Sequence, residues 1–313
     1  MIWEKYSIKE IRDILAAKTV DEIDNELIKS LKDDKRTGVQ KIAAKYIRIL
    51  EARNALVEKW NKMNQLPLIL SRKGYKLIAG IDEAGRGPLA GPVVAAAVIL
   101  DPDKPICGLD DSKKISEKNR EEFYSIIQEN ALGVGVGIVD NLVIDDLNIL
   151  QATFKAMKKA LNDLSIKPDL VLVDGNRDIP GLEIKQKTII DGDALVNPIA
   201  AASIIAKVTR DRIIYDYHEK YPEYGFNNNK GYGTAEHITA LKKYGPSPIH
   251  RYSFSIVNKA HFAQYRKKLV DTHSKKELRE LGELIGENEH FSGESLEILR
   301  RLYLERYRKI INE

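Results

Sequence analysis

The chain has 313 residues, 43% of them hydrophobic, which is enough for one large domain with additions. Its formal net charge is +4 and its isoelectric point is near 8.8, values that permit nucleic-acid binding without arguing for it. Cys107 is the only cysteine, so disulfides within the chain and cysteine-rich zinc sites are excluded. No apolar run reaches the roughly 18 residues of a membrane span, and the start lacks a signal-peptide core, so we expect a cytoplasmic protein without a membrane segment.

Residues 1–70 are expected to form an all-helical extension. Ser7 and Glu10 make a capping box that begins a first helix, and the stretch Thr19–Glu22 repeats this pattern before a second. Apolar residues at helical spacing predict a longer third helix over residues 39–63.

The third helix carries several basic side chains, Lys41, Lys45, Arg48 and Arg53. Two interpretations stay open, because charge runs on helices are usually solvated surfaces but also suit an auxiliary nucleic-acid contact. Pro67 and the residues up to Gly74 predict a junction between this extension and the central region.

Residues 71–258 mix strands with helices, as expected for an α/β layered domain. The first three strands suit an antiparallel group joined by short, glycine-containing loops. The predicted strands lie at residues 76–81, 93–100, 133–139, 170–173 and 183–190, and the predicted helices at about 145–164, capped by Asp145 or Asp146, and 198–218. Residues 259–313 predict a helical tail that either packs on the core or serves as a partner helix.

The segment GIDEAGRGPLAGP at residues 80–92 carries the clearest chemical signal. An apolar strand delivers Asp82 and Glu83, and a bare charge is costly to bury at such a position. A metal ion would remove that cost, since hard cations prefer carboxylate oxygens. Glycines then flank Arg86, whose guanidinium fork suits phosphate.

Further carboxylates follow along the chain. Asp174 comes directly after the apolar strand at 170–173, at the end where α/β sheets place their sites, although an Asp-Gly turn is the plainer interpretation. Asp191 and Asp193 stand before the long helix, where a helix N-cap is the alternative. The residues alone leave open which of these two would act as a ligand.

The 80–92 segment resembles the first motif of ribonuclease HII, the type 2 ribonuclease H family. Other segments resemble the family's later motifs in the same order, and the resemblance covers roughly Gly74 to Phe254. These segments are DDSKK (110–114), LVDGN (172–176), GDALVNPIAAASIIAKVTRDR (192–212), NKGYGTAEH (229–237) and GPSPIHRYSF (245–254). The resemblance implies the ribonuclease H fold, a mixed five-stranded sheet flanked by helices.

In that family the acidic residue follows the glycine of a Gly-Asp pair, which selects Asp193 over Asp191. The implied catalytic and metal-binding set is therefore Asp82, Glu83, Asp174 and Asp193. Four adjacent carboxylates cannot all stay ionised without cations. Two divalent ions, Mg²⁺ or Mn²⁺, would neutralise them and support phosphodiester hydrolysis.

The resemblance also implies a set of substrate-binding residues. Gly85, Arg86 and Gly87 match the family's sensor of the ribose 2′-hydroxyl, and Tyr232 matches the tyrosine that stacks on the following deoxynucleotide. Further residues match the family at phosphate-contact positions or nearby motif positions: Lys113, Lys114, Ser203, Lys207 and Arg251, the last expected to orient either site groups or phosphate.

The resemblance implies an endoribonuclease that cleaves RNA in RNA–DNA hybrids and at single ribonucleotides embedded in duplex DNA, leaving 3′-hydroxyl and 5′-phosphate ends. Two alternatives are a ribonuclease HIII-like hybrid nuclease, which has a different glycine loop and a sheet-containing N-terminal domain, and a non-catalytic hybrid-binding module. We expect a monomer, and a replication clamp stays open as a partner that no residue pattern supports.

Overall fold

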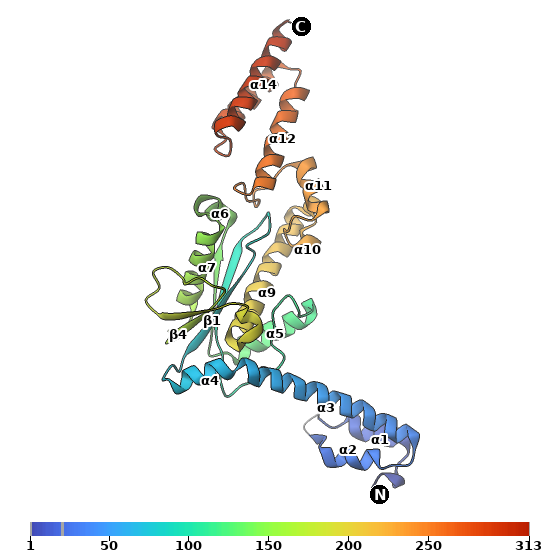
Figure 1. Cartoon of the computed structure of the whole chain (residues 1–313). Helices are drawn as coiled ribbons and strands as arrows, with labels where there is room; N and C mark the ends of the chain where they lie inside the picture. The colour runs from blue at the N-terminus through green and yellow to red at the C-terminus, as the bar shows by residue number, and fades with distance from the viewer. Residues whose placement is uncertain (1, 20–21, 313) are drawn as a thin grey trace. The chain divides into compact units, whose positions relative to one another are not determined.

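The computed structural model describes residues 2–19 and 22–312 (Figure 1). The described residues form two compact units, one up to Leu66 together with Pro105–Leu109, the other Pro67–Lys104 together with all residues from Asp110 onward. The three-part division at residues 70 and 258 stays a prediction. Among the described residues, no helix has both the length and the hydrophobicity to cross a lipid bilayer.

The first unit is built from three helices around its own apolar core. The helices are α1 (Ile8–Ala16), α2 (Asn25–Lys32) and α3 (Thr37–Met63). The core is formed by Trp3, Ile11, Leu15, Ile23, Ile28, Leu31, Val39, Ile42 and Ala43. The capping box of Ser7 and Glu10 is present as predicted.

The second helix begins later than the Thr19–Glu22 pattern predicted. Glu22 does accept a hydrogen bond from the Thr19 backbone N–H, at 2.7 Å, while Val20 and Asp21 lie outside the described residues. The cap of α2 is instead Asp24, whose side chain accepts from Leu27 N at 2.7 Å.

The predicted junction at Pro67 is a short helix, α4 (Gln65–Arg72). Pro67 is its third residue, where the missing N–H costs nothing because the first N–H groups of a helix have no intrahelical partner. Pro67 therefore does not break the chain, whereas the predicted break in the stretch from Ser71 to Gly74 is present as a turn at Lys73 and Gly74.

The second unit contains a mixed five-stranded sheet in the order β3-β2-β1-β4-β5, which confirms the predicted fold class. β1 pairs antiparallel with β2 and parallel with β4, β2 pairs antiparallel with β3, and β4 pairs parallel with β5. The strands are β1 (Ile78–Ala84), β2 (Val93–Ile99), β3 (Gly133–Val139), β4 (Leu170–Asp174) and β5 (Lys185–Ile189).

β1 runs three residues further than predicted, so that Asp82 and Glu83 lie inside the strand instead of after it. Pairing with β2 causes this extension, because the register continues from Asp82↔Ala96 through Glu83↔Ala95 to Ala84↔Val94. Both carboxylates are therefore held by a rigid strand.

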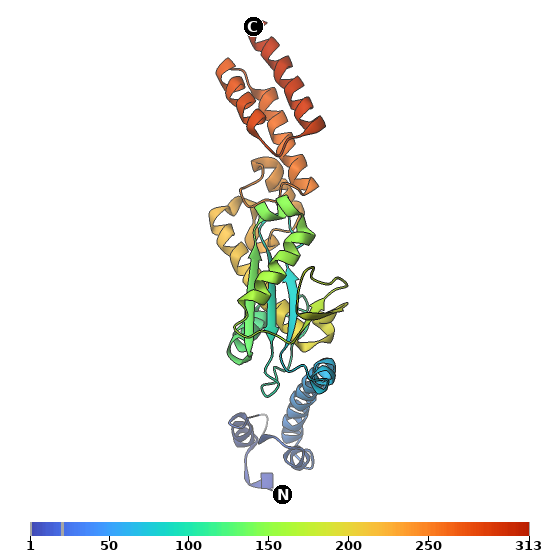
Figure 2. The same ribbon diagram turned by 90° about the vertical axis from the view of Figure 1, so that its left-hand side faces the viewer.

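Long helices cover the two faces of the sheet, α7 (Ile149–Asp163) and α9 (Asn197–Lys220). Figure 2 shows the green α7 in front of the strands. On the other face, α9 lies so close to β1 that a Cβ on Gly80 would sit 2.1 Å from the Pro198 carbonyl carbon. Gly80 is thus required for the approach that brings α9 beside Asp82.

The helix predicted at 145–164 is two helices, α6 (Asn141–Leu147) and α7. Asn148 separates them with a φ of 72°, and its side chain caps α7. The predicted cap residue Asp145 lies within α6 and accepts hydrogen bonds from the backbone of Tyr252 and Ser253, while Asp140 is the cap of α6.

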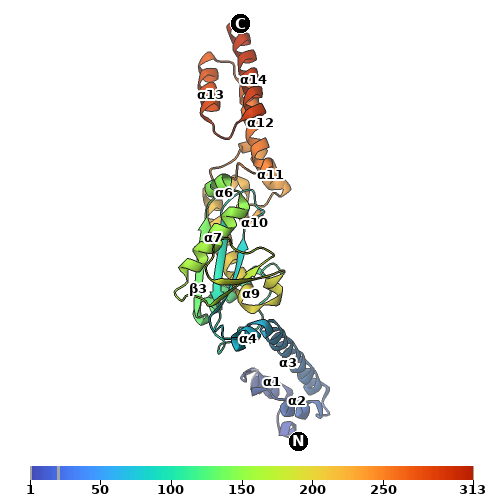
Figure 3. The same ribbon diagram turned by 60° about the vertical axis from the view of Figure 1, so that its left-hand side comes forward.

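The remaining helices flank the site and form the tail. Around the site these are α5 (Glu117–Asn130), which separates β2 from β3 where a short loop was predicted, α8 (Gly192–Leu195), α10 (Phe226–Asn229) and α11 (Ala235–Tyr244). The tail contains α12 (Ser255–Asp271), α13 (Lys275–Glu287) and α14 (Gly293–Asn312), seen together in Figure 3. α12 packs on the core through Val257 and Ala260, while Leu269 joins α13 and α14 in a separate apolar cluster.

Candidate functional site

A pocket of about 480 Å³ brings most of the predicted residues together. Its walls are the end of β1, the glycine loop after β1 (residues 85–92), the DDSKK segment, α9 and the segment around Tyr232. The lining residues are Asp82, Glu83, Ala84, Gly85, Arg86, Gly87, Ser112, Lys113, Arg120, Ser203, Lys207, Arg210 and Tyr232.

Asp82 is the most deeply buried of the predicted carboxylates, with 6% of its surface exposed. Its Oδ1 accepts from the Glu83 backbone N–H at 2.7 Å, and the Ser203 hydroxyl also bonds to it. Burial, followed by the charges of Glu83 and Asp174, raises its pKa well above the usual range. An ionised Asp82 therefore needs a positive charge nearby.

Glu83 already has one positive neighbour. Arg86 Nη1 lies 3.0 Å from Glu83 Oε1, and about half of the Arg86 side chain is exposed. Burial still raises the pKa of Glu83, against the lowering effect of Arg86. Arg86 thus links the carboxylates to the glycine loop.

Asp174 enters from the adjacent strand at the matching position, one residue past the Ile81↔Val173 pair. Its Oδ1 accepts from Gly192 N at 2.8 Å, which ties β4 to α8. Burial raises its pKa, while the backbone N–H groups of Gly192 and Asp193 oppose that rise.

Asp193 is buried in α8, whereas Asp191 is exposed and has a left-handed φ of 54°. Burial raises the pKa of Asp193, and the charges of Asp111 and Asp174 add to the rise. Asp191 also raises the pKa of Asp174, so both aspartates lie near that carboxylate. Burial distinguishes Asp193 as the inner residue of the two.

Asp111 is a carboxylate of this group that the sequence reasoning missed. It lies near Asp193, whose pKa it raises, and also faces Lys113 and Lys114, with Nζ to carboxylate distances of 4.0 and 3.9 Å. It lies in the DDSKK motif, in which only the two lysines were predicted to be site residues. Partial burial favours the neutral amine of Lys113, but Asp111 and the predicted carboxylates outweigh it and raise the Lys113 pKa.

The carboxylates fit a divalent cation by donor type and charge. Among residues 2–19 and 22–312, no three acidic, histidine or cysteine side chains converge closely enough to hold an ion by themselves. The donors are all carboxylate oxygens, which Mg²⁺ and Mn²⁺ favour, and their mutual repulsion is the charge that a cation would neutralise.

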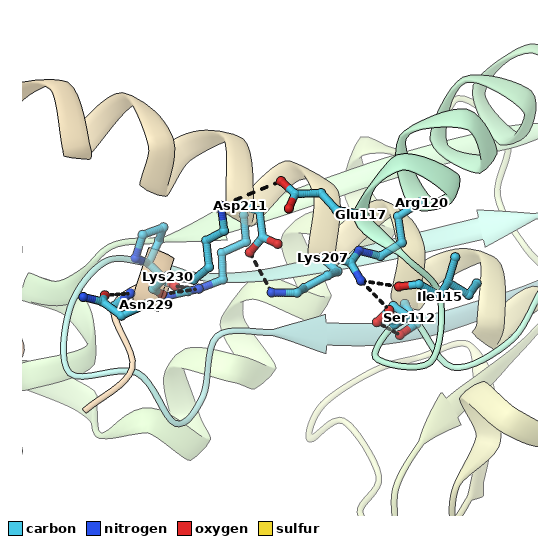
Figure 4. A network of polar contacts seen from close by, with 12 residues as sticks. Ser112, Ile115, Glu117, Arg120, Lys207, Asp211, Asn229 and Lys230 are labelled. Atoms are coloured by element: carbon cyan, nitrogen blue, oxygen red, sulfur yellow. Dashed lines mark hydrogen bonds and ion pairs between the residues drawn. The ribbon is translucent and has the colours of Figure 1, made fainter. Parts of the chain in front are cut away.

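Ser203 and Lys207 project from one face of α9 as predicted, but both already have protein partners. The Ser203 hydroxyl lies 2.9 Å from that of Ser112, in addition to its bond with Asp82. Lys207 Nζ lies 2.7 Å from Asp211 Oδ1, as Figure 4 shows. A substrate phosphate would compete with Asp211 for this ammonium group.

Arg120 of α5, which also lines the pocket, binds the backbone of the DDSKK segment. Its Nη1 donates to the carbonyl oxygen of Ser112 at 2.9 Å and to that of Ile115 (Figure 4). Lys113 lines the pocket, whereas the exposed Lys114 does not. Contact of either lysine with phosphate stays a prediction.

The prediction that Arg251 could contact phosphate is wrong, because the side chain is completely buried. Its guanidinium donates to carbonyl oxygens of the glycine loop: Gly85 at 2.6 Å, Arg86 at 3.0 Å, Pro88 at 2.8 Å, Gly91 at 3.0 Å and Pro92 at 3.1 Å. The alternative, that it orients site groups, agrees with this geometry.

Tyr232 stands beside the glycine loop with 44% of its surface exposed. A Cβ on Gly87 would lie 3.6 Å from its ring, so loop and ring are in contact. Behind it, His237 Nδ1 lies 2.8 Å from the Tyr232 carbonyl oxygen, and His237 Nε2 lies 3.0 Å from His250 Nε2. Sequence reasoning missed this histidine pair.

Comparison with known proteins identifies the relationships of the chain. Residues 79–257 match the family model of Ribonuclease HII, and residues 7–66 match that of the Ribonuclease HII N-terminal domain. Ribonuclease HII of Bacillus licheniformis is 50% identical over 255 residues, covering 82% of this chain and 98% of that protein. The corresponding values for Ribonuclease HII of Enterococcus faecalis are 50% over 252 residues, 80% and 97%.

Among solved structures, ribonuclease H2 from Pyrococcus horikoshii OT3 is similar with a TM-score of 0.52 and 31% identity. The match covers 59% of this chain and 97% of that chain. Neither family model extends past residue 257, so most of the helical tail lies outside the matched region.

Proposed function

Since the chain belongs to the ribonuclease HII family and is therefore a ribonuclease H enzyme, we propose that it hydrolyses RNA within RNA–DNA hybrids and at single ribonucleotides embedded in duplex DNA. Cleavage on the 5′ side of the ribonucleotide would leave 3′-hydroxyl and 5′-phosphate ends.

One observation carries this proposal. A single pocket combines two carboxylates that repel each other, the buried Asp82 and the partly buried Glu83, with a glycine loop and an exposed tyrosine. The carboxylates suit hydrolysis of a phosphodiester, while the loop and the ring suit recognition of a ribose and its neighbouring base. A binding module would gain nothing from gathering negative charge where phosphate must approach.

The roles of the residues follow from their positions. Asp82, Glu83, Asp174 and Asp193 would hold two divalent ions, Mg²⁺ or Mn²⁺, which supply activation of a water and stabilisation of the leaving 3′ oxygen. Arg86 and Lys113 offer positive charge to the phosphates on the pocket side. The backbone of Gly85–Gly87 offers polar groups to the 2′-hydroxyl, and Tyr232 offers an aromatic face to the next sugar and base.

The test is cleavage of a DNA duplex that contains one ribonucleotide, compared with an all-DNA duplex and an RNA–DNA hybrid, with Mg²⁺, with Mn²⁺ and with chelator. We expect metal-dependent cuts on the 5′ side of the ribonucleotide and in the hybrid, with none in DNA. Cleavage that persists in chelator, or equal cleavage of all-DNA duplex, would refute the proposal. The monomeric state and the cytoplasmic location stay predictions, and a clamp partner stays an open question.

A further inference from the structure

We propose that Arg210 is a positioning residue that couples the glycine loop to Tyr232, so that recognition of the ribose and stacking on the following nucleotide depend on one buried side chain. This inference rests on the proposed function, because it concerns how the same pocket distinguishes a single ribonucleotide from continuous RNA.

Arg210 lies on α9 and is 1% exposed, yet it borders the pocket. Its guanidinium donates to carbonyl oxygens of two segments that are far apart in the sequence. Nε bonds to Pro92 O at 3.1 Å and Nη2 to Ala90 O at 3.2 Å, while Nη1 bonds to Lys230 O at 3.0 Å. One fork therefore joins the end of the glycine loop to the residues just before Tyr232.

The glycine loop is shaped around this guanidinium. Gly85 has a φ of +96°, and a Cβ there would lie 2.1 Å from Arg210 Nε. Gly231, with a φ of +83°, would place a Cβ 3.5 Å from Nη2 and 2.8 Å from Ala90 O. Both segments thus approach Arg210 at glycines, where the left-handed backbone carries no steric cost.

The aromatic ring completes the arrangement. The Cζ atom of Arg210 lies 6.0 Å from the centroid of the Tyr232 ring, at the limit of a cation–π contact. The ring also meets the glycine loop at Gly87. Consequently a shift of Arg210 would alter the position of the ring relative to the loop that senses the 2′-hydroxyl.

Arg251 provides a useful contrast. It is equally buried, but its guanidinium donates to carbonyl oxygens that all lie between Gly85 and Pro92. Arg251 therefore shapes the loop itself, whereas Arg210 also holds Lys230 and the segment that carries Tyr232. Since the carbonyl contacts need a planar fork, lysine is not equivalent to arginine at position 210.

The experiment uses the full chain with Arg210→Lys and Arg210→Gln. Single-turnover kcat/KM is measured with Mg²⁺ on a DNA duplex with one ribonucleotide and on an uninterrupted RNA–DNA hybrid. We expect each variant to lose about tenfold more activity on the single ribonucleotide than on the hybrid, the scale of a misplaced stacking contact. Arg212→Gln is the matched control, because that arginine lies two residues further along α9 and is half exposed; we expect equal, small changes on both substrates.

A second comparison separates coupling from general damage. In a Tyr232→Ala background, Arg210→Lys should cause no further loss of selectivity, because both changes act through the same ring. Equal losses on the two substrates, additive selectivity losses, or failure of both Arg210 variants to fold would overturn the inference and leave a purely structural arginine. Failure of the wild-type chain to cut the ribonucleotide duplex would instead refute the proposed function, before any variant is compared.

Discussion

The two ends of the pocket differ in how fully the chain's own residues satisfy their polar and charged groups. At the recognition end, the carbonyl oxygens of the glycine loop are held by Arg210 and Arg251, and Tyr232 is held by His237. At the carboxylate end, burial and mutual repulsion raise the pKa values of Asp82 and its neighbours, and Arg86 and Lys113 compensate only part of the charge.

The two ends therefore differ in whether they need metal and substrate to become organised. The recognition end needs no further ligand to fix its backbone, because buried guanidinium groups satisfy its polar atoms. The carboxylate end keeps unfavourable interactions that only added positive charge would relieve. We therefore expect the recognition end to be present before metal and substrate bind, and the carboxylate end to be organised by them.

The largest effect should come from removing a carboxylate. Asp82→Asn or Asp174→Asn should reduce cleavage by several kcal/mol of transition-state stabilisation, since each removes a proposed metal ligand. The fold should survive, because the change removes a charge that its neighbours repel. Single-turnover rates and thermal melting check both parts, and a rate within about threefold of the wild type would contradict the assignment.

The same assay decides between the two neighbouring aspartates. Asp193 is buried beside Asp174 and Asp111, whereas Asp191 is exposed, so Asp193→Asn should be the more damaging change. If Asp191→Asn is the worse variant, the fourth ligand is Asp191, and burial has been a misleading guide.

Much of the fold and the carboxylate group could be predicted from the sequence because their signals are local. The sequence pattern predicted all five strands, and Asp82 and Asp174 were found because each follows an apolar run. The extension of β1 to Ala84 was missed because it depends on pairing with β2, a long-range contact. The break at Asn148 was missed because nothing in its neighbours requires a left-handed residue there.

The buried polar groups were the hardest part to predict. The sequence left open whether Arg251 orients site groups or phosphate, because a sequence does not show whether a charged side chain faces a ligand or backbone carbonyls. Arg210 and His237 lie within the matched motifs, but the sequence did not single them out, because the contacts of Arg210 with residues 90, 92 and 230 and of His237 with the His250 ring form only in the fold. The contacts of such residues are known only from the folded structure, in which the loops pack around them.

Loss of the tyrosine ring should weaken the recognition end selectively. Tyr232→Ala should reduce cleavage at a single embedded ribonucleotide by roughly 1–3 kcal/mol and reduce hybrid cleavage less, because a hybrid offers many alternative sites. Relative kcat/KM values on the two substrates measure this difference. Tyr244→Ala is a suitable control, as Tyr244 is similarly exposed and does not line the pocket. Equal losses for Tyr232→Ala would mean that the ring supports the fold.

Acid should loosen the recognition end through its histidine pair. Burial, with the charge of His237, lowers the pKa of His250 to about 3, and burial lowers that of His237. Since the folded state binds fewer protons, this stability is present above pH 6.5 and is lost as the pH falls toward 3. Between pH 7 and 5 the loss from His250 alone should be about 2 kcal/mol, measured by denaturant unfolding.

The raised carboxylate pKa values act in the opposite direction, because those groups take up protons more readily in the folded chain. Comparison with His250→Gln isolates the histidine contribution, and the exposed His273 gives the control His273→Gln. The free energy of unfolding of His250→Gln should depend less steeply on pH than that of the wild type. Parallel pH profiles would show that the pair does not carry this dependence.

The smallest effect should come from a region that belongs to neither end of the pocket. Lys41, Lys45 and Arg48 are exposed along one stripe of α3. If they contact duplex backbone, replacing all three by Gln should weaken binding and make its salt dependence shallower by about two to three in log–log slope. The cut position and metal requirement should stay the same, because phosphate contacts carry no sequence information.

Replacing the exposed Lys9, Arg12 and Lys29 by Gln gives a control with the same loss of charge in the same unit. Affinities of the three proteins at several salt concentrations decide the matter: equal slopes for the two variants would make α3 a solvated surface, and a moved cut site would mean that the first unit takes part in recognition after all.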